Sequence, residues 1–295
     1  MRKYSRIIFL TFALCSLIIY TLAQTGLPET IQAEEKSTGP KTEEGAKLTA
    51  EEIMSRTHLA FFYAGDDMKT RVSMSLITKD GKTRQRELVM LRKDIAEGGE
   101  QKYFIYFHKP DDIRRTTFMV WKYPAKDDDR WIFIPAVNMV RRIAAADSHS
   151  SFVGSDFPYE DVSGRELEAD THTLLPEEKL NDKPCYVIQS IPKTKSDYTR
   201  KISRIDQQTF LPLKEEYYDI QNELSRVFTA DKTEKIIINK EKEEYLWTIT
   251  KRTIENTKTK HRTEVTFKEV EYNLGMKDDT FTESNLKEPP SKWIK

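Results

Sequence analysis

Alternation of apolar and polar residues from residue 68 onward limits the fold more than any other feature of this chain. Between residues 68 and 78, Val72, Met74 and Leu76 alternate with polar side chains, as in a half-buried strand. Asp80-Gly81 then predicts a hairpin turn into a second strand. No long helical crossover, which parallel strands would need, interrupts the later segments. We therefore expect a mainly β (α+β) fold with an antiparallel sheet, whose strands we predict at 68–78, 83–93, 102–108, 115–123, 130–134, 137–143, 185–191, 200–206, 213–219, 224–230, 245–252 and 262–272.

Three of these segments, 103–107, 118–121 and 131–134, are apolar at consecutive positions, so both of their faces are apolar. A strand that is buried on both faces needs cover on both sides of the sheet. A curved sheet that wraps a few helices would supply this cover and leave an apolar hollow between the layers. An ordinary packed core is the alternative interpretation.

One helix is predicted before the sheet. Thr49 and Glu52 have the spacing of a capping box, and Ile53, Leu59 and Phe62 follow on an amphipathic pattern. We expect this helix at about 49–62, and at most another short helix between 147 and 180.

The first 33 residues have the layout of a secretory signal peptide. A basic start that includes Arg2 and Arg6 precedes an apolar run over 7–23, and cleavage would follow Ala23 or Ala33. An uncleaved membrane anchor is the alternative, although about 17 residues is at the lower limit for a span. Residues 34–47 then form a flexible linker, and 48–295 form a single domain. This layout predicts export to the periplasm.

Charge and cysteine content exclude several classes of function. The full chain has 48 basic and 48 acidic residues, and loss of the signal peptide leaves about two more acids than bases. We therefore expect no nucleic-acid partner. Cys185 would be the one cysteine left, so no internal disulfide is expected, and we interpret it as a small buried residue in a strand.

The sequence contains no recognisable motif of catalytic or metal-binding residues. The five histidines do not stand at metal-ligand spacing with one another or with a cysteine, and neither a Gly-x-Ser-x-Gly elbow nor a glycine-rich phosphate loop occurs. We therefore expect a protein that is not an enzyme and has no metal, cofactor or catalytic residue. An ester hydrolase would be the exception to look for.

The segment 147–164 combines turn residues with three aromatic side chains, Phe152, Phe157 and Tyr159. A polar loop that also contains aromatic residues is usually fixed to the rest of the molecule. One interpretation is a loop that plugs the end of the sheet. The functional interpretation is a lid over a cavity.

The sequence resembles the outer-membrane lipoprotein-sorting proteins, in the broader branch related to the LolA carrier. The resemblance covers roughly 48–275 and is most specific between Gly154 and Asp161. It is carried by Trp121-x-Tyr-Pro, Asp129-Arg130-Trp131-x-x-x-Pro135, Arg141-Arg142-Ile143, Ser151-Phe152-x-Gly154-Ser155-Asp156-Phe157-x-Tyr159-Glu160-Asp161 and Leu211-Pro212-Leu213-Lys214.

This resemblance implies a periplasmic protein with a strongly curved antiparallel sheet, an incomplete barrel of about 11 strands. Helices and a loop would form a lid on its concave apolar side. Such proteins take up acyl chains of lipids or lipoproteins, contact membranes transiently, and are often encoded beside inner-membrane exporters of the resistance-nodulation-division (RND) type.

Our leading hypothesis is therefore a carrier that holds acyl chains in an apolar cavity. Its candidate wall residues are Met74, Leu76, Phe104, Tyr106, Phe118, Val120, Trp121, Trp131 and Phe133. Its candidate lid residues are Ile53, Leu59, Phe62, Phe152, Phe157 and Tyr159.

A lipid-responsive sensor that binds a partner protein is the alternative hypothesis. Its partner surface would contain Arg84, Arg86, Arg141 and Arg142. These arginines could equally protect strand edges against aggregation.

Overall fold

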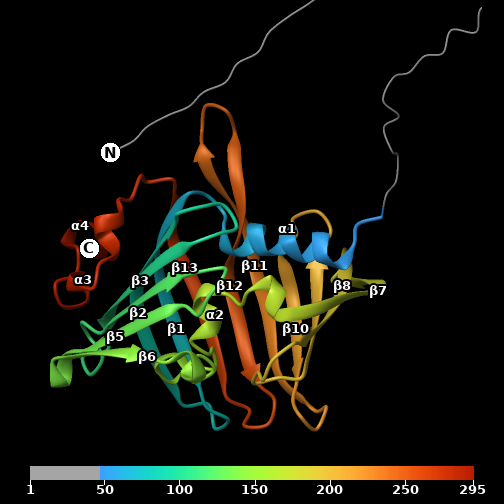
Figure 1. Cartoon of the computed structure of the whole chain (residues 1–295), viewed down its shortest axis with the longest axis horizontal. Helices are drawn as coiled ribbons and strands as arrows, with labels where there is room; N and C mark the ends of the chain where they lie inside the picture. The colour runs from blue at the N-terminus through green and yellow to red at the C-terminus, as the bar shows by residue number, and fades with distance from the viewer. Residues whose placement is uncertain (1–46) are drawn as a thin grey trace, which may run out of the picture. The chain divides into compact units, whose positions relative to one another are not determined.

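The computed structural model describes residues 47–295, so the expected signal peptide and all but the last residue of the expected linker lie outside the described part. Within it, 13 strands form one antiparallel sheet that does not close into a barrel (Figure 1). The strands are β1 (Asp67–Ile77), β2 (Thr83–Asp94), β3 (Gln101–Lys109), β4 (Thr117–Lys122), β5 (Asp129–Ile134), β6 (Met139–Ile143), β7 (Asp170–Leu180), β8 (Lys183–Pro192), β9 (Arg200–Asp206), β10 (Pro212–Tyr218), β11 (Leu224–Asn239), β12 (Glu244–Asn256) and β13 (Arg262–Tyr272).

The strand order joins two meanders at a single seam. The order is β6-β5-β4-β3-β2-β1-β13-β12-β11-β10-β9-β8-β7, so β1 pairs with β13 at the seam while β6 and β7 lie at opposite edges. The chain between β6 and β7 must therefore cross the whole width of the sheet. This crossing segment, residues 144–169, contains the short helices η2 (Ala145–Asp147), η3 (Phe152–Gly154), α2 (Glu160–Ser163) and η4 (Leu167–Ala169).

The two faces of the sheet bury separate clusters. On β2, Leu88 and Met90 belong to one apolar cluster, and Val89 and Leu91 belong to another. Because neighbouring residues of a strand point to opposite faces, the clusters lie on opposite sides of the sheet. We call the first side the inner face and the second the outer face. The expectation that the apolar strands need cover on both sides is confirmed.

Helix α1 (Ala50–Phe62) covers part of the inner face and lies across the strands (Figure 1). Its predicted capping box is present, because the Thr49 hydroxyl accepts from the backbone N–H of Glu52 while the Glu52 carboxylate accepts from Thr49. At its other end, the buried guanidinium of Arg92 donates to the carbonyls of Phe62 (2.7 Å) and Ala64 (2.6 Å). Both ends of the helix are thus held.

The C-terminal segment covers the outer face, which the sequence did not indicate. It contains η5 (Asp278–Phe281), α3 (Ser284–Lys287) and α4 (Ser291–Ile294). Phe281 and Leu286 are fully buried against the outer face, and the Phe281 carbonyl accepts from the indole N–H of Trp121 (3.0 Å).

The strand prediction is correct in type and incomplete in number. The sheet has 13 strands, whereas the pattern predicts twelve and the family resemblance implies about 11; β7 is the strand that the pattern does not predict. Pro176 lies within β7, where the pairing with β8 shifts register between Leu175 and Glu178. Proline is tolerated at such a bulge on an edge strand, but in a sequence it argues against a strand.

Smaller expectations are confirmed. Gly81 turns between β1 and β2 with φ +83°, and Cys185 is a buried free cysteine in β8. Among residues 47–295, no helix has the length and apolar character needed to cross a membrane.

Candidate functional site

Three neighbouring pockets lie between the inner face and its cover, and we call them together the inner cavity. Their volumes are about 90, 70 and 30 Å³. The first lies beneath α1, the second behind Phe61 and Phe62, and the third beneath the crossing segment. Phe61 and Phe62 line the first two, Phe157 lines the first and third, and Arg252 lines all three. The three pockets therefore share walls and adjoin one another.

The third pocket is the most apolar part of the inner cavity. Its floor is built from inward-facing residues of β1, β2, β3 and β13, and Phe152 and Phe157 of the crossing segment form its roof. The floor residues are Val72, Met74, Leu88, Met90, Ile105, Val265 and Phe267.

The cover of the cavity is locked by close packing at Gly164. A Cβ atom on this residue would lie 2.7 Å from the ring of Phe62, and its φ of +80° also favours glycine. The Gly164 carbonyl accepts from the buried ammonium of Lys122 on β4 (2.8 Å). The end of α1, the crossing segment and the sheet therefore meet at one point.

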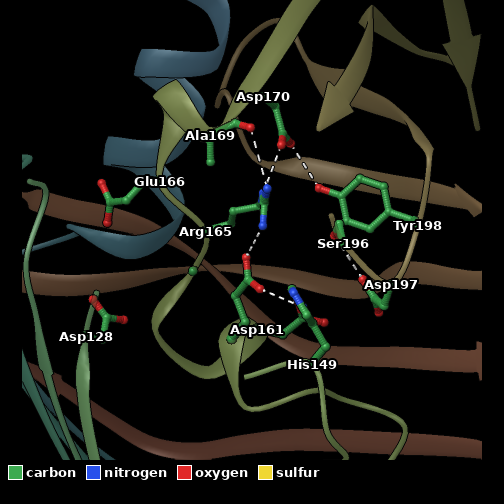
Figure 2. Close-up of polar contacts among 12 residues, drawn as sticks. Asp128, His149, Asp161, Arg165, Glu166, Ala169, Asp170, Ser196, Asp197 and Tyr198 are labelled. Atoms are coloured by element: carbon green, nitrogen blue, oxygen red, sulfur yellow. Dashed lines mark hydrogen bonds and ion pairs between the residues drawn. The ribbon is translucent and has the colours of Figure 1, made fainter. Parts of the chain in front are cut away.

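A polar network forms one wall of the first pocket (Figure 2). The Arg165 guanidinium lies between two carboxylates, 2.8 Å from Asp170 and 2.8 Å from Glu160. The Tyr198 hydroxyl also donates to Asp170 (2.9 Å), and His149 lies 3.0 Å from Glu160. This network fixes the end of the crossing segment and the start of β7 to Tyr198, which precedes β9, by charge-assisted hydrogen bonds.

Burial changes the titration of several groups that line the first pocket. Desolvation lowers the pKa of His58 to about 3, so this imidazole is neutral near pH 7. Desolvation also raises the pKa of Asp161 to about 6, although Arg226 at 4.0 Å opposes the shift. Burial lowers the pKa of Arg252 to about 10. Its guanidinium lies over the aromatic rings of Phe61, Phe157 and Phe267.

A model of a family of uncharacterized proteins matches residues 99–288, well over half of the chain. The crystal structure of a DUF1329 family protein from Desulfovibrio piger superposes with a TM-score of 0.73 at 26% identity, over 80% of this chain and 97% of that one. The chain belongs to this DUF1329-type family.

Two further crystal structures have the same fold. A putative outer membrane lipoprotein-sorting protein domain from Vibrio parahaemolyticus is 26% identical, with a TM-score of 0.73 over 81% of this chain and 98% of that one. A LolA superfamily protein from Nitrosomonas europaea, at 18% identity and a TM-score of 0.62 over 81% and 99%, is alike in fold. No curated protein matched the chain.

The structure of this DUF1329-type chain brings part of the predicted site together. Met74 lines the third pocket, and Leu76, Phe118 and Val120 belong to the same inner-face cluster. Among the lid candidates, Phe62, Phe152 and Phe157 line the inner cavity, and Tyr159 packs against Phe118 and Phe152. Ile53 packs instead on Ile188 and Ile205 of β8 and β9, and Leu59 lies beside Gly98.

Five wall candidates lie on the outer face, where the C-terminal segment covers them: Phe104, Tyr106, Trp121, Trp131 and Phe133. They line none of the three pockets. Their strands are apolar on both faces, so the sequence contains no signal for which face the cavity occupies. We therefore no longer assign these five residues to the wall of the cavity.

Several cavity residues were not predicted, above all Arg252, Phe61 and Phe267. The alternation of the sequence does not indicate that Arg252 faces the cavity, because the pairing of β11 with β12 shifts register near this residue. Strict alternation from the buried Ile249 would place Lys251 on the inner face, but the irregularity brings Arg252 there instead.

The arginines of the sensor hypothesis do not form one surface. Arg86 donates to the carbonyl of Val153 and so holds the crossing segment, while Arg84 is exposed on β2. Arg141 and Arg142 lie on the edge strand β6, where Arg142 pairs with Asp129. In the described part of the chain, no group of three or more histidine, cysteine or acidic residues could hold a metal ion.

Proposed function

We propose that this protein is a non-enzymatic periplasmic carrier that takes up acyl chains of lipids or lipoproteins in its inner cavity. It would receive them from an inner-membrane exporter of the RND type, contact membranes transiently, and release its cargo towards the outer membrane. The observation that carries the proposal is the apolar inner cavity beneath a separate cover, in a fold shared with a putative outer membrane lipoprotein-sorting domain. The leader-like residues 1–33 support the location.

The physical role of such a cavity is to remove apolar surface from water. Burial of a methylene group stabilises by about 0.8 kcal/mol, so two chains of roughly 16 carbons represent more than ~20 kcal/mol of hydration cost. A protein can offset this cost by burial alone, without any chemical step.

The small volume of the inner cavity supports a mechanism in which cargo displaces part of the cover. Each pocket, at about 90 Å³ or less, is below the ~300–1,000 Å³ of ordinary ligand sites. An acyl chain would therefore have to move α1 or the crossing segment outward. The free energy of that movement lowers the net affinity and makes release feasible.

The decisive experiment is lipid analysis of the protein purified from a bacterial periplasm. Organic extraction and mass spectrometry should find a phospholipid or lipoprotein acyl chain in stoichiometric amount, and the stripped protein should take up a fluorescent lipid. Phe157→Asp should abolish uptake, whereas Val137→Asp, at an exposed apolar position, should leave it unchanged. An empty protein that takes up no fluorescent lipid would refute the carrier and favour the sensor hypothesis.

A further inference from the structure

The position of Arg252 in the inner cavity points to a specific kind of cargo. Arg252 lies on β12, opposite Ala230 of β11 and Val265 of β13, and its side chain lines all three pockets. Three phenylalanine rings surround its guanidinium, with ring centres at 5.0 Å for Phe267, 5.1 Å for Phe157 and 5.7 Å for Phe61.

The other charged side chains of the inner cavity have partners. Lys201 lies 3.0 Å from Glu215, and Arg165 pairs with Glu160 and Asp170. Arg226, beside the first pocket, contacts Asp197 at 2.7 Å and Asp161 at 4.0 Å, while Glu166 contacts Lys122. Arg92 donates to the carbonyls at the end of α1.

In the described part of the chain, Arg92 and Arg226 also have a buried Nε without a hydrogen bond, but their other guanidinium nitrogens have partners, and in this Arg252 differs from them. Within residues 47–295, no hydrogen bond or ion pair reaches its guanidinium, and its Nε is buried without a partner. The side chain as a whole is half-buried and borders the cavity. A charge that is largely withdrawn from water is normally stabilised by a counter-ion or a full set of hydrogen bonds, because desolvation of a charged group is unfavourable. Contacts with aromatic rings compensate for only part of this cost.

An arginine cannot avoid the cost by losing its proton at physiological pH. Its planar donors match the paired oxygens of a carboxylate or a phosphate. The apolar third pocket begins beside Arg252, so a chain attached to such an oxyanion would extend directly onto Val72, Met74 and Leu88.

We propose that Arg252 binds the anionic head group, a carboxylate or a phosphate, of a cargo whose acyl chain occupies the apolar part of the inner cavity. This inference rests on the proposed carrier function and adds the chemical class of the cargo. The first pocket, one wall of which is the polar network, is also lined by Arg252 and would accommodate whatever is attached to the head group.

The test uses three ligands with the same saturated chain: palmitate, hexadecyl phosphate and hexadecanol. Their dissociation constants for the full mature protein are measured by displacement of a fluorescent fatty alcohol at neutral pH. At least one of the two anions should bind about 10- to 100-fold more tightly than hexadecanol, as expected for hydrogen bonds to a charged group. Preference for palmitate alone identifies a carboxylate, and preference for hexadecyl phosphate alone identifies a phosphate.

The variant Arg252→Gln should remove this preference and change the affinity for hexadecanol by less than about threefold. Arg252→Lys, which retains the charge without the planar donors, should keep part of it. The matched control is Arg84→Gln, which removes an exposed arginine from β2 and should leave the preference intact. Circular dichroism of each variant establishes that it is folded.

The outcomes separate this inference from the carrier proposal. If hexadecanol binds but the wild-type protein shows no preference for either anion, the role of Arg252 is refuted while the carrier remains. A preference that survives in Arg252→Gln would also refute it, because the guanidinium would then be a packing element among the three rings. If none of the three ligands binds, the carrier proposal fails as well.

Discussion

Several ionisable side chains lie beneath α1, and burial determines how each of them behaves. His58 is 7% exposed and packs against the rings of Phe62 and Tyr63. In these surroundings the imidazole is more stable neutral than charged. The cavity therefore presents paired charges and the unpaired guanidinium of Arg252, and His58 contributes no charge near neutral pH.

His58 should make the protein less stable in mild acid. The unfolded chain binds a proton at this residue below about pH 6.5, whereas the folded protein does not until about pH 3. Acidification from pH 7 to pH 5 therefore favours unfolding by about 2 kcal/mol through this group. We expect the free energy of unfolding of His58→Gln to gain about that much relative to wild type over this interval, measured by urea denaturation. Between pH 7 and 8 the difference should be constant, and a constant difference down to pH 5 would contradict the assignment.

Substitutions on both faces of the sheet should lower stability, but only those on the inner face should reduce cargo uptake. Phe157 and Trp131 are both almost fully buried, but Phe157 lines the inner cavity and Trp131 packs beneath the C-terminal segment. Phe157→Ala and Trp131→Ala should each cost about 3–5 kcal/mol of unfolding free energy. Uptake of fluorescent lipid should fall only in Phe157→Ala. Equal loss of uptake in two folded variants would place the cargo elsewhere.

At the scale of elements, the sequence predicts structure well where one local rule dominates. The capping box at Thr49 and the turn at Gly81 depend on near neighbours, and both are present. The sequence does not predict an element or its packing where contacts between residues far apart in the chain determine the structure. Pro176 conceals β7, and the cover of the outer face by Phe281 could not be foreseen, because nothing local in 276–295 indicates where the segment packs.

The same distinction explains the candidate site. Alternation correctly groups Phe118 with Val120 and Trp131 with Phe133, because residues two apart on a strand share a face. It cannot say which group meets the cavity. That choice follows from the path of residues 144–169 across the sheet, which is a consequence of strand order and not of local sequence.

Substitution of Arg92 should weaken the attachment of the C-terminal end of α1 to the sheet. This buried side chain donates to the carbonyls of Phe62 and Ala64 at the C-terminal end of the helix, where no intrahelical donor exists. Arg92→Met should lower the free energy of unfolding by about 3 kcal/mol, since hydrogen bonds to a charged group are lost. Hydrogen exchange should accelerate more in residues 57–63 than in β3 or β8. The matched control is Arg84→Met, and uniform acceleration across the sheet would show that the effect is not local to α1.

At the scale of the whole molecule, the pairing of β1 with β13 joins two meanders. One meander consists of β1 to β6 and the other of β7 to β13, and each is continuous in sequence. Met68 pairs with Tyr272, so the seam connects residues about two hundred positions apart. Closure of such a long loop is entropically costly and slows folding. Side chains that stabilise the seam should therefore influence the entire sheet, including the floor of the cavity.

Asp67 is the residue through which this prediction can be tested. Its buried carboxylate accepts from the backbone N–H groups of Leu274 (2.6 Å) and Met276 (2.7 Å), and so fixes the chain that leaves β13 for the outer face. In Asp67→Ala both N–H groups lose their partner, so we expect a loss of about 3 kcal/mol or more in the free energy of unfolding. The adjacent Asp66→Ala removes an exposed carboxylate and should change it by less than about 0.5 kcal/mol.

The position of Asp67 at the seam also predicts how the protein unfolds. If the seam holds the two meanders together, Asp67→Ala should retain a single cooperative urea transition at a lower midpoint, with tryptophan fluorescence and far-ultraviolet circular dichroism changing together. Two separate transitions would mean that the meanders fold independently and that the inner cavity, which both of them line, can lose one half of its floor without unfolding the other.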